Sequence, residues 1–219
     1  MRFPLCDILS KIAQMKQNQI IAVIFSLFFN VLFSNLYSQD LKNEMFFNQN
    51  EIDYKFEQND KIEKLFNKNN IDSIKIILRS KNGSTFSVFI KNNLNKTLKL
   101  NPQDSSLYLI QEALDKNGKW NPIEFWAYSD CGNSYDNFLD FKNNQILHLT
   151  TDRYNGNFKT KVRIKLLMNK KNYYSNSITG KINISKFKKS TWYSQIKEML
   201  YPKKSEKEAE NKMFLNTSL

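Results

Sequence analysis

The sequence has very few of the residues on which most catalytic and metal-binding motifs depend. Its 219 residues include one histidine, His148, and two cysteines, Cys6 and Cys131. No Walker loop and no GxGxxG, GxSxG or CxxC pattern occurs. A zinc site built on a single histidine and a single cysteine would need two further carboxylates. The sequence therefore predicts no metal ion and no cofactor.

Glycine, proline and arginine are also scarce. Five glycines and four prolines exclude collagen-like and proline-rich disordered chains. Only four of the 33 basic residues are arginine, although the formal net charge is +12. Arginine is the usual residue for reading phosphates and bases through paired hydrogen bonds. The surplus of lysine, together with the abundance of asparagine and isoleucine, is most simply explained by an AT-rich genome. Nucleic acid is therefore not the expected partner.

An apolar run, IIAVIFSLFFNVLF at positions 20–33, follows Lys11 and Lys16 and precedes the polar stretch SNLYSQD. This order is the anatomy of a secretory signal peptide, which we place at residues 1–39. The run is shorter than the roughly 20 residues of a membrane-spanning helix. Met15 is an alternative start, which would make residues 1–14 an artefactual extension. The expected location is the periplasm, the cell surface or the exterior; the alternative is a protein tethered by an uncleaved N-terminal segment.

Period-two alternation follows a polar, asparagine-rich lead-in at residues 40–70, which we expect to be partly helical or disordered. From 71 to 187, apolar and polar residues alternate in seven or eight short segments separated by turn residues, a pattern typical of half-buried strands. DKNGK, at positions 115–119, is a strong hairpin signal. The expected fold is all-β, an antiparallel β-sandwich.

The run from QILHL through RYNGNFKTKVRIKL resembles a segment of immunoglobulin-like and fibronectin-type modules, in which a strand, an aromatic-glycine turn and an alternating strand follow one another. The resemblance implies an immunoglobulin-like sandwich with Trp126 as a core tryptophan. It covers about half of the chain and concerns architecture only, because the Cys–Trp–Cys spacing of antibody domains is absent.

Residues 188–219 form the last part of the predicted organisation. TWYSQIKEMLY is predicted to form a short helix capped by Ser190 or Thr191. Its apolar face should consist of Trp192, Ile196, Met199 and Leu200. The mixed-charge tail KKSEKEAENK is expected to fray.

The stretch KWNPIEFWAYSDCGNSYDNFLDF, at positions 119–141, looks most like a site. One interpretation is an exposed aromatic and polar platform for sugar or peptide, formed by Trp120, Glu124, Trp126, Tyr128, Asn133 and Tyr135. The other is a structural corner at Cys131 and Gly132, which we favour because large aromatic side chains are buried more often than they bind ligands.

The corner interpretation makes definite statements about packing. Trp126 and Cys131 should pack against the strands Val88–Ile90 and Val162–Leu166, and Gly132 should adopt a backbone angle that a side chain would resist. Replacing Cys131 with alanine should then lower the free energy of unfolding by about 1 kcal/mol, and replacing Trp126 should lower it by about 3–5 kcal/mol.

Catalysis has little support in the sequence. After signal cleavage, Cys131 and His148 are the only thiol and imidazole that a Cys–His hydrolase could pair, and chance alone supplies one of each. Oxygen ligands for calcium are present, but not at the spacing of an EF-hand, in Asp130, Asn133, Asp136 and Asp140. We therefore expect neither a catalytic centre nor a metal site.

A ladder of cations is the clearest pattern on the predicted strands. Lys159, Lys161, Arg163 and Lys165 alternate with apolar residues and should share the outer face of one strand. Cations on other strands could extend this face: Lys75, Arg79, Lys91 and Lys181. A positive face suits anionic polysaccharide, lipopolysaccharide or acidic lipid. The alternative is a solvated face that prevents edge aggregation.

The function predicted from the sequence is an exported, non-catalytic binding or structural module at the periplasm or cell surface. Its partner would be an anionic envelope polysaccharide or another envelope protein. Two alternatives stay open. One is an accessory subunit of an envelope complex, docked through the basic face or the C-terminal helix, and the other is a hydrolase of unrecognised type.

Export gives the first test. Expressed in a Gram-negative host, the chain should leave the cytoplasm and lose roughly 4 kDa, the mass of its first ~39 residues, through signal-peptidase cleavage. Intact-mass spectrometry of the cell fractions measures this loss. Full-length protein in the membrane pellet would indicate an uncleaved anchor instead.

Overall fold

The computed structural model describes residues 43–66, 73–80, 83–129, 131–135 and 138–216. The predicted signal segment at 1–39 lies outside these residues. Lys42–Leu219 form one compact unit, and the fold described below is that of this unit. Within the described ranges, no helix has the length and apolar composition needed to cross a membrane.

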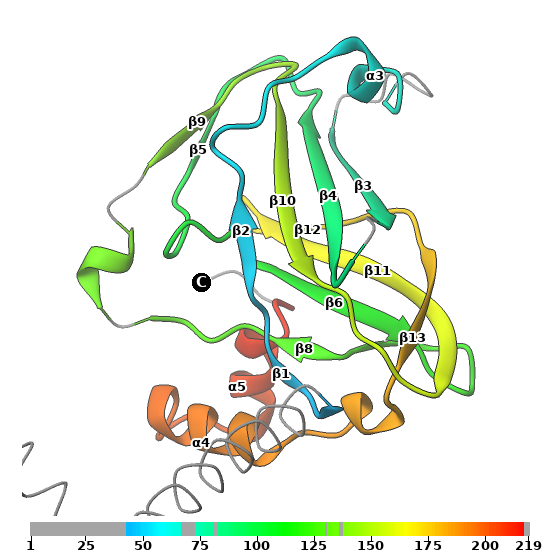
Figure 1. Ribbon diagram of the computed structural model, residues 1–219. Helices are drawn as coiled ribbons and strands as arrows, with labels where there is room; N and C mark the ends of the chain where they lie inside the picture. The colour runs from blue at the N-terminus through cyan, green and yellow to red at the C-terminus, as the bar shows by residue number, and fades with distance from the viewer. Residues whose placement is uncertain (1–42, 67–72, 81–82, 130, 136–137, 217–219) are drawn as a thin grey trace, which may run out of the picture. The chain divides into compact units, whose positions relative to one another are not determined.

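Two antiparallel sheets make up most of the unit (Figure 1). The first sheet consists, in spatial order, of β2 (Asn50–Ile52), β10 (Ile146–Asp152), β4 (Thr85–Asn92) and β3 (Ile74–Ser80). The second consists of β12 (Lys171–Tyr174), β11 (Phe158–Met168), β6 (Leu109–Leu114) and β7 (Trp120–Pro122), and β13 (Ile178–Ile182) also pairs with β11. Two short pairs accompany them: antiparallel β5 (Leu98–Leu100) with β9 (Leu139–Phe141), and parallel β1 (Phe46–Phe47) with β8 (Glu124–Phe125).

Apolar residues at every second position explain why the two sheets face each other. Val88 and Leu149 of the first sheet are fully buried, as are Leu109, Ile164 and Leu166 of the second. All five belong to one hydrophobic cluster, here called the inter-sheet core. Burying a side chain of this size contributes roughly 1.5–3 kcal/mol, so this core is the main source of stability for the pair of sheets.

The strands with the strongest alternation lie where the sequence predicts them, and the strand-rich, antiparallel arrangement agrees with the all-β expectation. The predicted hairpin at Asp115–Lys119 is confirmed and joins β6 to β7. The amide of Gly118 donates to the carbonyl of Asp115, and Gly118 has a φ of +75°, a conformation that glycine adopts at little cost.

The polar lead-in is more ordered than its composition suggests. Ile52 of β2 pairs with Leu149 of β10 and is buried, and Met45 is buried as well. The short helix α3 (Asp60–Glu63) follows, with Asn59 as its N-cap. The described part of the lead-in thus contains both a short helix and, at residues 50–52, a strand. A short polar segment can form a strand here because the edge of the neighbouring sheet supplies hydrogen-bonding partners for its backbone.

The C-terminal residues form a second hydrophobic cluster, the C-terminal core, on the other side of the second sheet. It contains Met45, Ile110, Phe125, Trp126, Leu167, Tyr193, Ile196, Met213, Phe214 and Leu215. Helix α4 (Thr191–Leu200) contributes Tyr193 and Ile196, whereas the predicted face residues Trp192 and Met199 are exposed. That part of the helix prediction is wrong. The face of α4 that packs against the β-sheet and α5 is rotated relative to its most apolar face, so that Tyr193 is buried in place of Trp192.

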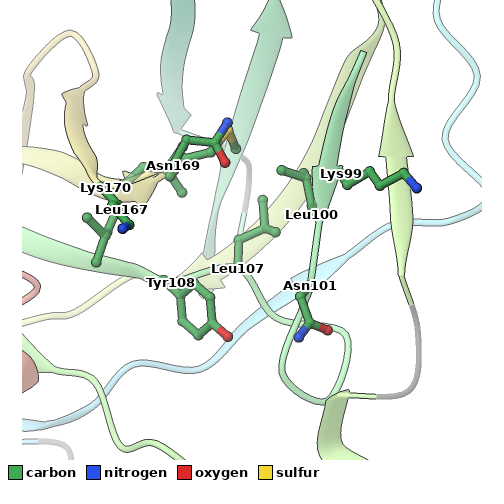
Figure 2. A pocket seen from close by; sticks show the side chains of 10 residues that line it. Lys99, Leu100, Asn101, Leu107, Tyr108, Leu167, Asn169 and Lys170 are labelled. Atoms are coloured by element: carbon green, nitrogen blue, oxygen red, sulfur yellow. The ribbon is translucent and has the colours of Figure 1, made fainter. Parts of the chain in front are cut away.

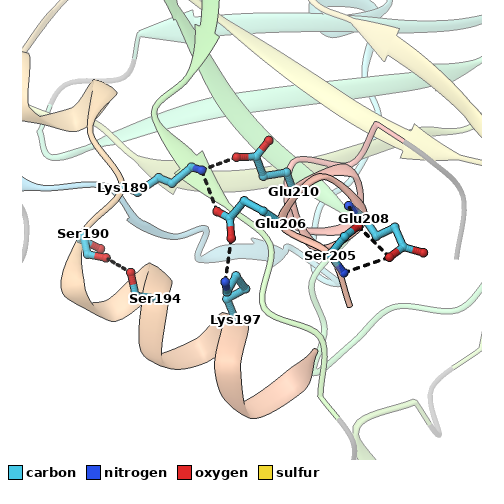
Figure 3. Close-up of polar contacts among 8 residues, drawn as sticks. All are labelled: Lys189, Ser190, Ser194, Lys197, Ser205, Glu206, Glu208 and Glu210. Carbon is cyan, nitrogen blue, oxygen red and sulfur yellow. Dashed lines mark hydrogen bonds and ion pairs between the residues drawn. The ribbon is translucent and has the colours of Figure 1, made fainter. Parts of the chain in front are cut away.

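The mixed-charge tail does not fray as predicted. Residues Glu206–Met213 form helix α5, which begins with a capping box between Ser205 and Glu208 and buries Ala209 and Met213. Glu206 of α5 forms ion pairs with Lys197 of α4 and with Lys189, which lies just before α4 (Figure 3). Exposed pairs of this kind contribute little, so the buried face of α5 accounts for its docking.

Two methionines provide a matched test of this docking. Replacing the fully buried Met213 with alanine should lower the free energy of unfolding by about 2–5 kcal/mol, because it leaves a cavity in the C-terminal core. The same change at Met199, which is 70% exposed, should alter it by less than about 0.5 kcal/mol. Urea unfolding measures both. Equal, small effects would mean that α5 is not packed in solution.

Candidate functional site

The predicted aromatic platform does not form. Glu124 is fully buried and Trp126 is 2% exposed, so neither can meet a ligand at the surface. Trp126 packs in the C-terminal core, where its ring makes edge contacts with those of Tyr108 and Tyr128. Trp120 lies instead on the outer face of the second sheet. The segment is two short strands, β7 and β8, rather than one, and Phe125 and Trp126 both enter the same core.

The corner prediction is wrong in its details. Cys131 is an exposed free cysteine. Gly132 is also exposed, does not have a positive φ, and has open space where a Cβ would lie. Trp126 belongs to a different cluster from Val88 and Ile90. The predicted small cost of replacing Cys131 therefore cannot come from lost packing.

A surface turn of 3₁₀ geometry, η1 (Gly132–Tyr135), occupies this part of the chain. The hydroxyl of Tyr135 donates to the carbonyl of Ser129 at 2.7 Å and to the side chain of Gln103 at 3.1 Å. The hydroxyls of Ser129 and Ser134 are 2.9 Å apart. Asn133 is exposed. Polar contacts from Ser129 and Tyr135, not burial of the cysteine, hold the turn.

Glu124 has a structural role that the sequence did not reveal. Its carboxylate accepts hydrogen bonds from the amide and the side chain of Gln111, at 2.7 and 2.8 Å, from the side-chain amide of Asn48 and from the hydroxyl of Tyr154. The ammonium group of Lys186, itself fully buried, lies 3.6 Å from the centre of the Tyr154 ring. This set of residues is called the buried carboxylate network below.

Burial determines the titration of this network. It raises the pKa of Glu124, while the hydrogen bonds from Tyr154 and Asn48 and the charge of Lys186 oppose that shift. Burial and the nearby carboxylate together raise the pKa of Tyr154 well above its ordinary value. The network is enclosed between the sheets, so its chemistry supports the fold and not a ligand site.

The basic ladder on β11 divides into two halves. Lys165 is buried and donates to the carbonyl of Phe214 at 2.8 Å, so its predicted outward exposure is wrong. Burial lowers the pKa of Lys165. Arg163 pairs with Glu112 at 2.7 Å and is partly covered. Lys159 and Lys161 are exposed as predicted. The C-terminal core covers one half of the face and leaves the other open.

The open half of this sheet combines cations with aromatic rings. The guanidinium carbon of Arg163 lies 4.2 Å from the ring centres of both Trp120 and Tyr174. Lys159 is directly opposite Lys181 on β13. We call this area the basic-aromatic surface; it consists of Trp120, Lys159, Lys161, Arg163, Tyr174 and Lys181.

Three of the four cations expected to extend the ladder, Lys75, Arg79 and Lys91, lie on the first sheet and do not join it. Lys91 pairs with Glu63 at 3.2 Å, and the ammonium group of Lys75 donates to the carbonyl of Phe66. Arg79, at the end of β3, is exposed. Of the four predicted extensions, Lys181 alone is paired in register with β11.

An apolar pocket of about 270 Å³ opens elsewhere, between β5 and the β11–β12 turn. Leu100 and Leu107 point toward Leu167 and Asn169 across it, whereas the ammonium group of Lys99 points away (Figure 2). Burial raises the pKa of the lining residue Tyr108 to about 12. The pocket has an apolar floor but no convergent charged groups, which makes it a weaker candidate for a specific site than the basic-aromatic surface.

The structure does not pair His148 with Cys131. The imidazole of His148 contacts the carboxylate of Asp53 and the hydroxyl of Ser87, neither of which the sequence pattern singled out. Among the described residues, no group of three or more His, Cys, Asp or Glu side chains could hold a metal ion. Asp130 and Asp136, two of the calcium candidates, lie outside those residues.

Comparison with known proteins adds no relative: no protein-family model matches the chain, and no curated protein or solved structure is significantly similar to it.

The pH dependence of stability tests the buried carboxylate network. Burial raises the folded-state pKa of Glu124 above its ordinary value of 4.5. The contribution of Glu124 to the free energy of unfolding is therefore fully present below about pH 4.5 and is lost as the pH rises through the folded-state pKa. The wild type should therefore lose stability relative to Glu124→Gln over that range, by at most about 1.4 kcal/mol per pH unit. Glu51→Gln, at an exposed site, is the control. Parallel stability curves for wild type and Glu124→Gln would contradict the raised pKa.

Proposed function

We propose that this protein is an exported binding module that holds an anionic polysaccharide on its basic-aromatic surface. The observation that carries the proposal is the pair Lys159 and Lys181, two exposed lysines directly opposite one another on neighbouring strands. Like charges in that position destabilise a sheet. None of the ion pairs among the described residues includes Lys159, Lys161 or Lys181, so a bound polyanion would relieve their repulsion.

The neighbouring aromatic rings favour sugar over other polyanions. Tyr174 is 46% exposed and presents ring surface beside the lysines, and amphipathic rings of this type suit a partly wet contact. Arg163 donates to Glu112 through both Nε and Nη2, which leaves lysines as the available cations. Lysine acts as a point charge. Sulfates or carboxylates spaced along a polysaccharide match such charges better than base edges do.

The proposed module is also exported and immunoglobulin-like. An immunoglobulin-like arrangement is the architecture we infer, because two antiparallel sheets share one core. Export is inferred from the apolar run at 20–33. A second candidate function is that of an envelope-complex subunit docked through α4, which the exposure of Trp192 and Met199 favours.

Binding to immobilised heparin, used as a probe polyanion, tests the proposal. The dissociation constant should rise steeply with salt. Replacing Lys159, Lys161 and Lys181 with glutamine should weaken binding by about 10- to 100-fold at low salt, at roughly 1 kcal/mol or less per lysine, with no change in melting temperature because all three are exposed.

The matched control is the variant in which Lys64, Lys203 and Lys207 become glutamine, since these lysines are also exposed and the net charge changes equally. It should bind almost as the wild type does. Equal weakening of both variants would show that only net charge matters. Capture of an envelope protein that is lost on replacing Trp192 and Met199 would favour the docking role instead.

A further inference from the structure

Three residues on the outer face of the first sheet form a hydrogen-bonded relay. Asp53 follows β2, His148 lies in β10 and Ser87 lies in β4, on neighbouring strands. The imidazole Nδ1 of His148 is 3.0 Å from Oδ2 of Asp53, and its Nε2 is 3.3 Å from Oγ of Ser87. With the ring proton on Nδ1, the imidazole donates to the carboxylate and accepts from the hydroxyl.

The surroundings fix the orientation of the imidazole. Its ring stacks on that of Phe89, with centres 4.8 Å apart and planes at 22°, and Phe56 covers it at 5.3 Å. The amide of Asp53 donates to the carbonyl of His148 at 2.9 Å, so the backbone holds the carboxylate beside the ring. A base that contacts a hydroxyl and is oriented by a third group is the arrangement that activates a serine.

We propose that Ser87 is an activated nucleophile with which this protein hydrolyses small carboxylic esters. The Oγ of Ser87 attacks the ester carbonyl carbon while His148 Nε2 takes its proton. The bond to the alcohol then breaks, and the departing oxygen receives that proton. Water repeats the sequence on the acyl-serine, which releases the acid and restores the hydroxyl. Ester and water are the reactants, and no redox partner is involved.

Accessibility limits the substrate to a small acyl group. Ser87 is 7% exposed, so an acetyl group fits better than a long chain. A polar cavity of about 480 Å³ begins beside it, at Thr85 and Thr150, the latter directly opposite Ser87. Glu51, Asp104 and Asp152 also line that cavity. Three carboxylates disfavour an anionic alcohol portion, so neutral or cationic esters are the expected class.

The developing oxyanion needs a side-chain partner. Ser87 lies on a central strand that is paired on both sides, so its own amide is used by the sheet. Arg79 is directly opposite Ser87 on β3 and is exposed. Side chains at opposite positions approach within about 5 Å at Cβ, which brings the guanidinium within reach of the oxyanion. Arginine is a suitable stabiliser for that charge.

The test combines p-nitrophenyl acetate hydrolysis with a fluorophosphonate probe, whose attachment site is mapped by peptide mass spectrometry. All measurements use a Cys131→Ala background, because this exposed thiol can react with activated esters. The probe should label Ser87. Ser87→Ala should abolish labelling and reduce hydrolysis to the rate in buffer, whereas Ser134→Ala, a control serine, should change neither.

Asp53→Asn should slow labelling at least tenfold, since the carboxylate orients the imidazole, and Asp53→Glu should restore part of the rate. Melting temperatures should stay unchanged, because the Asp53 side chain is 41% exposed. Absence of label on Ser87 would overturn the proposal. So would hydrolysis that survives Ser87→Ala, or a labelling rate that does not respond to Asp53→Asn.

Discussion

The buried carboxylate of Glu124 is the interaction on which the rest of the structure depends. It connects β8 to Gln111 of β6, to Asn48 before β2, and to Tyr154 before β11. Removing a charge from water costs several kcal/mol unless hydrogen bonds compensate. Four such bonds, together with the charge of Lys186 in the short 3₁₀ helix η2 (Ile184–Phe187), offset part of that cost, and burial still outweighs them, so the pKa of Glu124 stays raised. Segments from both ends of the unit therefore meet at one carboxylate.

This constraint also determines which part of the second sheet stays uncovered. Lys186 fixes the chain just before α4, and Ser190 at the start of α4 donates to the carbonyl of Met45 at 2.6 Å. The helices that follow cover one half of the outer face of the second sheet, where Lys165 contacts the last described residues through Phe214. The other half retains exposed lysines and aromatic rings. The basic-aromatic surface is thus the part of the sheet that the C-terminal core does not reach.

The sequence could predict those features that depend on local pattern. Alternation over 158–168 located β11, Asn-Gly located a hairpin, and the outward position of Lys159 and Lys161 followed from the same period. It could not predict features that depend on distant partners. In the sequence alone, Lys165 and Lys186 cannot be told from solvent-exposed lysines, because the elements that cover them are distant in the chain. His148 likewise contacts Asp53 and Ser87, which are 95 and 61 positions away in the sequence. The tail residues 206–213 carry too few apolar side chains to reveal that two of them complete a core.

We propose that this uncovered half of the second sheet is the binding surface of the protein. The most direct measurement is a titration of isotope-labelled protein with a heparin oligosaccharide, followed by backbone amide chemical shifts. The account predicts that shifts concentrate at Lys159–Arg163 and Lys171–Lys181, because these residues form the basic-aromatic surface and its rim. It also predicts that the amides around α3 and α5 stay unchanged. Shifts centred on α3, on α5 or on the apolar pocket beside β5, or no shifts at all, would contradict it.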